Sequence, residues 1–528
     1  MKASINRKGE LRDAPDAELP SEKPAWTMRR QLARLCAGLG RRALDSSHSR
    51  KAEFYLRKSV EFDRSSFEAA IQLAKVRVAL GDRVGALASL SASWRLQPNR
   101  ATAEEMAKLS ELPPATTRNA SPFRIFLSIQ DLLAYLKANR TLSGIQRLQT
   151  ALIERVLSDA STELAIGFAD PLHVARTGNF WRLSALDLER LLNFVWNADL
   201  DQEVLRARIE EIEGRAFLCD PGQGDAIVVV GASWGANFNS KQLGHAKTQG
   251  ARVCAFVFDV IPLTHPKLCD PTIVKDFASG FRSLGDVADL LLTSSEFNAR
   301  EIRRVWNPAD SPPDTRVVKL AATRLCERAA EAKVLGLPQL EGAAFVLYVA
   351  TLEPRKNHAY AFEVWRRLIE EGFAIPDLVL AGRSAWGSET VLGHIQSSSH
   401  LKGRVHLAQG LGDRALADLY EGCLFTVYPS LVEGWGLPVG ESLAYGKPCI
   451  ASATSSIIEV GDGLVDYIDP TNLESGVTAV RRMAGDTDYR SRRQAEILEN
   501  FRERTWSDVA ADILHVVGAA RPDAASLL

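Results

Sequence analysis

The chain has 528 residues, enough for about three domains of ordinary size. Its 64 basic and 65 acidic side chains leave a net charge of −1, so no basic excess points to nucleic acid as a partner. No apolar run reaches the roughly 18 residues that cross a membrane. The seven cysteines form no C-x-x-C pair, which excludes the common zinc and redox motifs. This pattern favours reduced thiols in a cytoplasmic protein.

The first part of the chain changes character near residue 26. Residues 1–25 are rich in charge and contain three prolines, so we expect them to be disordered. From residue 26 to residue 112 the pattern is helical, and two segments repeat with a period of 34 residues. The repeated positions are Ala52, Leu56 and Ser59, which recur as Ala86, Leu90 and Ser93. This segment resembles the tetratricopeptide repeat, and it is either a hairpin that packs on the rest of the chain or a module that binds a partner.

The segment 28–44 places five arginines among leucines and permits two interpretations. As a basic amphipathic helix, it would lie on an anionic membrane surface and attach the protein to the inner face of the plasma membrane. Alternatively, its leucines pack as the first helix of the repeat hairpin while its arginines face solvent. Gly40 lies one repeat period before Ala74, which favours packing.

After a linker at 110–122, short apolar runs alternate with helical segments. The expected strands include "FRIFLSI", "AIVVVG", "VCAFVFD", "DLLLTSS", "FVLYVAT", "DLVLAG", "RVHLAQG", "FTVYPS" and "KPCIAS". Such strands between helices indicate parallel sheets covered on both faces, and they are too many for one compact sheet. We therefore predict an α/β fold with two doubly wound, Rossmann-like domains at 120–335 and 336–500, followed by a C-terminal helix and tail at 501–528 that crosses back to the first domain.

Two cations follow the first strand of the second domain, in "YVATLEPRKNH". Arg355 and Lys356 stand just before a helix, where free backbone amides and two positive charges make a site for an anion such as a diphosphate. A solvated charge pair is the alternative for these two residues taken in isolation.

A second segment, "EGWGLPVGESLAYGKP", places Glu433 and Glu441 eight residues apart around a glycine loop. Gly434 and Gly436 would let backbone amides approach a ligand, and Pro438 can begin a helix with Glu441 in its first turn. A carboxylate there can accept two hydrogen bonds from a vicinal diol such as ribose. Alternatively, Glu441 is a partner of the helix dipole, but that role explains neither Glu433 nor the glycines.

These segments together resemble the family 4 retaining glycosyltransferases of the GT-B fold, whose E-x7-E signature matches Glu433 and Glu441. The resemblance extends through "LEPRKNH", "LAGRSAWGSE" and "SSIIEVGDG" and covers the second sheet domain. It implies that Glu441 binds the ribose of a nucleotide-sugar donor, that Glu433 contacts the donor sugar, and that Arg355 and Lys356 neutralise the diphosphate. Further donor-binding candidates are Gly434, Gly436, Leu437, Pro438, Val439, Gly382 and Arg383.

The first sheet domain resembles the family less closely and is expected to admit the acceptor. Ser143 and Gly144, in "NRTLSGIQRLQTALI", are expected to face the cleft. Many relatives carry His-Asp where this chain has Phe258 and Asp259, so Asp259 is the candidate here, with His265 nearby. In "LTSSEFNARE", the paired serines Ser294 and Ser295 are helix-cap candidates.

Two D-x-D triplets, at 199–201 and 486–488, could hold a divalent metal on a diphosphate, but neither follows a convincing strand, so we interpret both as surface acids. We therefore expect no metal and no cofactor. The predicted function is transfer of a sugar, mannose among the options, from a nucleotide sugar to a glycan or lipid-linked oligosaccharide with retention, in bacterial surface polysaccharide synthesis. Alternatives are a non-catalytic scaffold acting through the helical repeats, and an epimerase or phosphorylase of the same fold.

Overall fold

The computed structural model describes residues 23–45, 48–62, 66–80, 86, 89–90, 124–139, 142–158, 166–168, 180–196, 201–213, 216–219, 221–232, 240–306, 313–325, 343–397, 401 and 403–519. The chain divides into two compact units, residues 1–117 and residues 118–528. Residues 1–25 were expected to be disordered. Of these, 1–22 lie outside the described residues, as does the linker at 110–122, whereas 23–25 are helical, so the prediction is wrong for these three residues.

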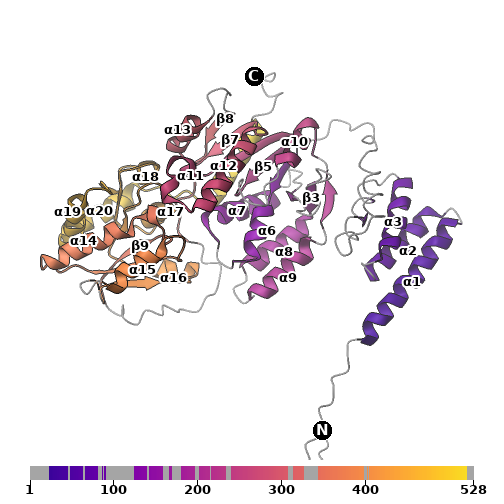
Figure 1. Ribbon diagram of the computed structural model, residues 1–528, viewed down its shortest axis with the longest axis horizontal. Coiled ribbons are helices and arrows are strands. Elements are labelled where there is room, and N and C mark those ends of the chain that lie inside the picture. The colour runs from indigo at the N-terminus through magenta and orange to yellow at the C-terminus, as the bar shows by residue number, and fades with distance from the viewer. Residues whose placement is uncertain are drawn as a thin grey trace, which may run out of the picture. The chain divides into compact units, whose positions relative to one another are not determined.

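The N-terminal unit contains three described helices, α1 (Lys23–Asp45), α2 (Ser49–Phe62) and α3 (Phe67–Ala79) (Figure 1). Gly40 of α1 faces Leu56 of α2 so closely that a Cβ atom there would stand 2.6 Å from the leucine Cγ. The Ser59 hydroxyl donates a hydrogen bond of 2.9 Å to the Ala33 carbonyl. Small residues thus lie where these helices touch, but Leu32 and Leu35 of α1 are 36% and 60% exposed, so the expected packing of the leucines holds only in part. Ser93 of the second repeat lies outside the described residues.

The first sheet of the second unit has eight described strands in the order β4-β3-β2-β1-β5-β6-β7-β8. Their bounds are β1 Ile125–Ser128, β2 Ile166–Phe168, β3 Phe180–Leu183, β4 Phe217–Cys219, β5 Ala226–Val230, β6 Arg252–Val257, β7 Leu290–Thr293 and β8 Asp314–Val317. Strands β1, β5, β6 and β7 were predicted. The predicted parallel sheet extends from β2 to β8, and antiparallel strands extend it at one edge, where β3 runs antiparallel to both β2 and β4. The edge strands β2, β3 and β4 were not predicted.

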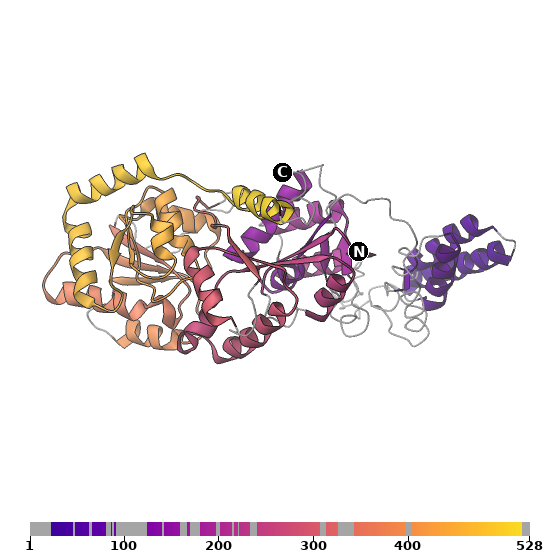
Figure 2. The ribbon, with the colours of Figure 1, turned by 90° about the horizontal axis from the view of Figure 1, so that it is seen from above.

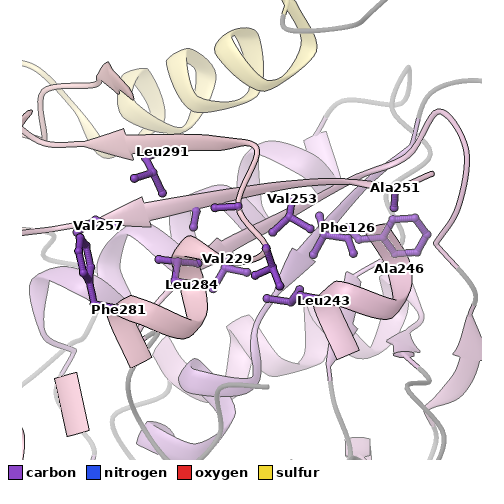
Figure 3. Packing of buried hydrophobic residues seen from close by; sticks show 14 of the residues in the cluster. Phe126, Val229, Leu243, Ala246, Ala251, Val253, Val257, Phe281, Leu284 and Leu291 are labelled. Carbon is purple, nitrogen blue, oxygen red and sulfur yellow. The ribbon is translucent and has the colours of Figure 1, made fainter. Parts of the chain in front are cut away.

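Helices cover both faces of this sheet. They are α6 Gln130–Leu136, α7 Gly144–Ser158, α8 Ala185–Trp196, α9 Gln202–Glu213, α10 Ser240–Thr248, α11 Ile261–Thr264, α12 Pro271–Gly285 and α13 Glu296–Val305. On one face, Phe281 and Leu284 of α12 and Leu243 of α10 pack against Val229 and Val253 of the central strands (Figure 3). This continuous apolar layer holds β5, β6 and β7 in register, so the loops after these strands start from fixed positions.

The second sheet is parallel throughout, with the order β11-β10-β9-β12-β13-β14. Its strands are β9 Phe345–Val349, β10 Asp377–Ala381, β11 Val405–Ala408, β12 Thr426–Tyr428, β13 Cys449–Ser452 and β14 Asp466–Ile468. Numbered within this domain, the order is 3-2-1-4-5-6, the doubly wound arrangement of dinucleotide-binding domains. The chain reverses direction across the sheet between β9 and β12, and ligands bind beyond the carboxyl ends of the strands at such a point.

The helices of this domain are α14 His358–Glu370, α15 Ser388–Ser397, α16 Asp413–Gly422, α17 Leu437–Ala444, α18 Ile457–Gly461, α19 Leu473–Gly485 and α20 Thr487–Asn500. The last described helix, α21 (Trp506–Ala519), returns to the first sheet domain and packs against α7 (Figure 2). The α/β class with two Rossmann-like domains is therefore confirmed. Within the described helices, none is long and apolar enough to span a membrane.

Candidate functional site

The site lies at the reversal point of the second sheet, where the loops after β9 and β12 meet. The Leu431 amide donates a hydrogen bond of 2.9 Å to the Arg355 carbonyl, which joins the two loops directly. Asn357 adopts a left-handed conformation with φ of 61° and donates from Nδ2 to the carbonyls of Pro429 and Pro470, at 3.1 and 3.0 Å. These bonds bring the two cations of the first loop beside Glu433 of the second.

Glu433 is 4% exposed and its two carboxylate oxygens face both cations. Oε1 accepts from Lys356 Nζ at 2.5 Å and from the Tyr428 hydroxyl at 2.9 Å, while Oε2 accepts from an Arg355 guanidinium nitrogen at 2.6 Å. A carboxylate has about four acceptor positions, so one remains for a further donor. The sequence-predicted trio of Glu433, Arg355 and Lys356 is thus assembled in one place.

Electrostatics keeps this carboxylate ionised. Burial would raise the pKa of Glu433, but the positive charges of Arg355 and Lys356 lower it to about 2. Burial, with help from Arg355, lowers the pKa of Lys356, and Glu433 opposes that shift. Arg355 is also bound by Glu353 at 2.7 Å. The positive charges of Arg355 and Lys356 are therefore offset by the carboxylates of Glu353 and Glu433. The sequence did not indicate this charge pairing.

Glu441 lies in the second turn of α17, not in the first turn as expected, because α17 begins at Leu437. The N-cap residue of α17 is Gly436, whose φ of 108° is a left-handed conformation that favours glycine. Side chains on a helix lean toward its N-terminus, so the Glu441 carboxylate is still directed back toward the loop. The Tyr420 hydroxyl donates to Glu441 Oε2 at 2.8 Å.

The first sheet domain contributes an ion pair beside Glu441. Arg147 of α7 binds Asp413, the first residue of α16, at 2.5 Å. Burial raises the pKa of Glu441, whereas Arg147 and the Tyr420 hydrogen bond lower it. The Glu441 carboxylate therefore sits where α16, α17 and the opposite domain meet.

The glycines are required by close approaches between chain segments. A Cβ atom at Gly434 would stand 2.7 Å from Asp259 Oδ2, in the other domain. A Cβ at Gly144 would stand 2.4 Å from the Leu437 side chain, and one at Gly382 would stand 1.9 Å from the Ala350 carbonyl oxygen. Gly434 thus lets the opposite domain approach the loop, a reason that differs from the ligand approach expected from the sequence.

The start of α17 presents unused hydrogen-bond donors. In the described part of the chain, no acceptor pairs with the backbone N–H groups of Gly434, Trp435, Gly436 and Leu437. Pro438 has no N–H to satisfy, and the Val439 N–H bonds the Gly436 carbonyl at 3.0 Å. Free amides at a helix N-terminus bind anions, so this end of α17 suits a phosphate group.

These elements enclose a cavity of about 500 Å³ between the two sheet domains. All of the predicted donor-side residues line it except Val439. Arg383 is exposed at its border, and its guanidinium has no hydrogen-bond or ion-pair partner among the described residues.

Three of the four acceptor-side candidates line the cavity. Ser143, Gly144 and Asp259 line the cavity, whereas His265 does not. His265 instead contacts the neighbouring Thr264 hydroxyl through Nδ1 at 2.8 Å. Burial raises the pKa of Asp259, and Arg355 opposes that shift. The structure therefore brings Asp259 to the donor-side loops and leaves His265 outside.

The second acidic triplet has a structural role at the start of a helix. Asp486 accepts a hydrogen bond from the Tyr489 amide at 2.8 Å and caps α20. Residues 199 and 200 of the first triplet lie outside the described residues. In the described ranges, no group of three or more His, Cys, Asp or Glu side chains is arranged to hold a metal ion.

Several residues at the site were not anticipated from the sequence. Tyr428 and Tyr420 bind the two glutamates, and Arg147 reaches Asp413 from the opposite domain. In the sequence, Tyr428 ends an apolar run and Tyr420 precedes one, so both would be predicted to be core residues. The Arg147–Asp413 contact spans 266 positions, so no local pattern indicates it.

The family described as "Glycosyl transferases group 1" matches residues 336–495. The O-antigen chain mannosyltransferase B of Escherichia coli is 30% identical over 261 residues, which cover 49% of this chain and 68% of that protein. The serotype-specific mannosyltransferase WbdA of Escherichia coli is 25% identical over 223 residues, 40% of this chain but 27% of its own length. Among solved structures, sucrose-phosphate synthase from Thermosynechococcus elongatus is 17% identical with a TM-score of 0.47, covering 75% of this chain and 98% of that one.

Proposed function

This chain belongs to the glycosyl transferases group 1 family and is a glycosyltransferase, and we propose that it moves mannose from a nucleotide sugar to a growing glycan or lipid-linked oligosaccharide with retention of the anomeric configuration. The observation that carries the proposal is the loop 433–441 at the reversal point of the second sheet. It combines a cation-bound carboxylate, unpaired amides and a second carboxylate around one cavity.

The ribose, the diphosphate and the sugar of a nucleotide-sugar donor each have a matching group in this cavity. The ribose hydroxyls would donate to the Glu441 carboxylate. Among the described residues, this carboxylate accepts one side-chain hydrogen bond, from the Tyr420 hydroxyl. The diphosphate would lie against the free amides from Gly434 to Leu437 and the partly exposed Arg355. The donor sugar would then reach Glu433, which has one acceptor position left.

Catalysis would be electrostatic. Negative charge grows on the diphosphate as the glycosidic bond breaks, and preorganised cations and amides stabilise that charge without moving. Lys356 and Arg355 are held in place by Glu433 before any donor arrives. Because both Glu433 oxygens are held by cations, this carboxylate is a poor nucleophile, so we propose that the acceptor attacks on the face that the diphosphate leaves.

The acceptor would enter from the first sheet domain, past Ser143 and Asp259, which line the same cavity. Mannose is the proposed sugar because the two curated relatives named above are mannosyltransferases, one of them an O-antigen chain mannosyltransferase. By the same reasoning, the proposed acceptor is a bacterial surface polysaccharide under construction.

A panel of nucleotide sugars tests the proposal, with GDP-mannose tested first. Binding is scored by thermal stabilisation and by slow hydrolysis without acceptor. We expect one donor to stabilise the protein and to be hydrolysed slowly. A donor that is converted to an epimer without acceptor would indicate an epimerase, and a protein that binds no nucleotide sugar would contradict the proposal in favour of a scaffold.

Metal independence is a separate prediction. Arg355, Lys356 and the loop amides supply the positive charge that a divalent ion provides in other glycosyltransferases, so EDTA is expected to leave the transfer rate within about twofold. The measurement is the initial rate of transfer before and after chelation. If chelation abolished transfer and magnesium restored it, the charge assignment would be wrong.

The N-terminal unit is proposed to bring the enzyme to its acceptor, through a protein partner or an anionic membrane surface. Leu35 is 60% exposed on α1, and Arg34 and Arg41 of the same helix are exposed as well. A variant without residues 1–112 is expected to bind the donor with unchanged affinity, because no described residue of this unit lines the cavity. Its transfer to the natural acceptor should fall. A truncated protein with a native melting transition that failed to bind donor would contradict this division of labour.

A further inference from the structure

One backbone carbonyl of the Glu433 loop is held by the opposite domain. The Gly434 carbonyl accepts from the Ser294 hydroxyl at 2.8 Å and from Asn298 Nδ2 at 2.5 Å. The same two side chains also contact the Phe258 carbonyl, at 3.2 and 2.8 Å. Because Phe258 precedes Asp259, this pair joins the loop that carries the acceptor-side candidate to the loop that carries Glu433.

The pair is buried and its hydrogens are fully used. Ser294 is 0% and Asn298 1% exposed. The hydroxyl and the amide together supply three hydrogens, and the acceptors around them are the Gly434 carbonyl, the Phe258 carbonyl and the serine oxygen itself. Water would not replace a missing donor at these exposures. If Asn298 were replaced by an apolar side chain, the single Ser294 hydrogen would remain for two carbonyls, and one of them would lose its hydrogen bond.

This contact fixes the direction of the next amide. The described chain contains no cis peptide, so the Gly434 carbonyl and the Trp435 N–H point in opposite directions. The carbonyl is directed at Ser294 and Asn298, and the N–H is therefore directed away from them. That N–H has no acceptor among the described residues, and both residues of this peptide line the cavity.

The helix that carries Asn298 is itself held from the second domain. Ser295 caps α13 by accepting from the Asn298 amide at 3.1 Å. The Glu459 carboxylate of α18 accepts from the first two amides of α13, those of Glu296 and Phe297, at 2.9 and 2.8 Å. Ser456, the N-cap residue of α18, donates to the Glu433 carbonyl at 2.8 Å. The Glu433 loop is thus clamped between α13 and α18.

We propose that Asn298, with Ser294, is a positioning residue that orients the Gly434–Trp435 peptide so that the Trp435 N–H binds the diphosphate of the donor. The inference rests on the proposed function. In this proposal, two side chains of the first sheet domain orient an amide of the second domain that contacts a donor phosphate. The amide is held in this orientation only while the two domains are in contact. Asn298 acts through the backbone and touches no substrate.

The test compares nucleoside diphosphates with monophosphates, because the oriented N–H serves the diphosphate group. GDP, GMP, UDP and UMP are titrated against the full-length protein and its Asn298→Leu variant, in which a side chain of similar size donates no hydrogen bond. For the nucleoside that the unaltered protein binds, we expect the diphosphate affinity of the variant to fall about tenfold or more and the monophosphate affinity to stay within about twofold.

A matched control is Asn500→Leu, since Asn500 also donates from Nδ2 to a backbone carbonyl but lies on the surface of α20. It should change neither affinity. If Asn298→Leu weakened both nucleotides equally, or neither of them, the positioning role would be wrong. If the unaltered protein bound none of the four nucleotides, the proposed function itself would fail, and that outcome is distinct from the first.

Asn298→Asp provides a readout that a purely structural role would not produce. A protonated carboxyl can donate to the Gly434 carbonyl, whereas an ionised one cannot and would repel it. The variant's transfer rate relative to the unaltered protein should therefore fall as the pH rises through the pKa of the introduced carboxyl. A ratio that does not change with pH would contradict the inference.

Discussion

The Glu433→Gln variant is expected to lose about 100-fold or more in turnover while it keeps or gains affinity for the nucleoside diphosphate. The loss follows because the carboxylate proposed to contact the donor sugar is gone and because Arg355 and Lys356 are no longer fixed by it. The affinity is kept because Glu433 now neutralises cations that the diphosphate would otherwise use. The measurement is kcat from initial rates beside the dissociation constant of the diphosphate.

The same substitution should change stability in a pH-dependent way. The pKa of Glu433 is about 2 in the folded protein, below the ordinary value of 4.5. A depressed pKa stabilises the fold above pH 4.5, and this contribution is lost as the pH falls toward 2. Breaking a buried ion pair costs up to about 3–5 kcal/mol. The variant should therefore melt lower at neutral pH, and the difference should shrink in acid.

Rates and affinities of this variant are compared well below its melting transition, with Glu474→Gln as the control. Glu474 is an exposed glutamate in the first turn of α19 and does not line the cavity. The outcome that would sink the Glu433 assignment is a stable, folded Glu433→Gln protein with unchanged turnover. A parallel loss of turnover and diphosphate affinity would show that Glu433 serves binding instead of catalysis.

The second large effect concerns the ribose. Glu441→Ala is expected to weaken donor binding by about 100-fold or more, because two hydrogen bonds to a charged acceptor are lost, each worth about 1.5–3 kcal/mol. The Tyr420 hydroxyl also loses its 2.8 Å bond to Glu441 in the variant and keeps a 3.5 Å contact with the Pro438 carbonyl. The donor Michaelis constant and direct titration both measure this effect.

Tyr420→Phe separates the two contributions, since it removes the hydroxyl but leaves the Glu441 carboxylate in place. It should weaken donor binding far less than Glu441→Ala. If Glu441→Ala bound the donor as tightly as the unaltered protein, Glu441 would be a structural partner of Tyr420 and no ribose acceptor.

The sequence was sufficient to place both motif loops at one edge of the second sheet. Each follows an apolar run, and parallel strands end at the same edge. What it could not show is that β9 and β12 are neighbours, since their pairing depends on a strand order that spans some eighty positions of chain. That adjacency is what brings Lys356 within 2.5 Å of Glu433.

Other features depend on contacts between distant segments. The conformation of Gly436 sets the start of α17 and so moves Glu441 out of the first turn. The reason for glycine at 434 is a side chain, Asp259, from the other domain. Ser294 and Ser295 look alike in the sequence, yet Ser295 caps α13 while Ser294 binds the Gly434 carbonyl.

The most direct test of the ribose and diphosphate assignment is a binding cycle on Glu441. The nucleoside diphosphate of the donor that passes the panel and its 2′,3′-dideoxy analogue are titrated against the unaltered protein and Glu441→Ala. We expect the unaltered protein to prefer the ribose form by about 100-fold or more and the variant to show almost no preference. An equal preference in both proteins would contradict the assignment of Glu441, because the ribose would then be recognised elsewhere.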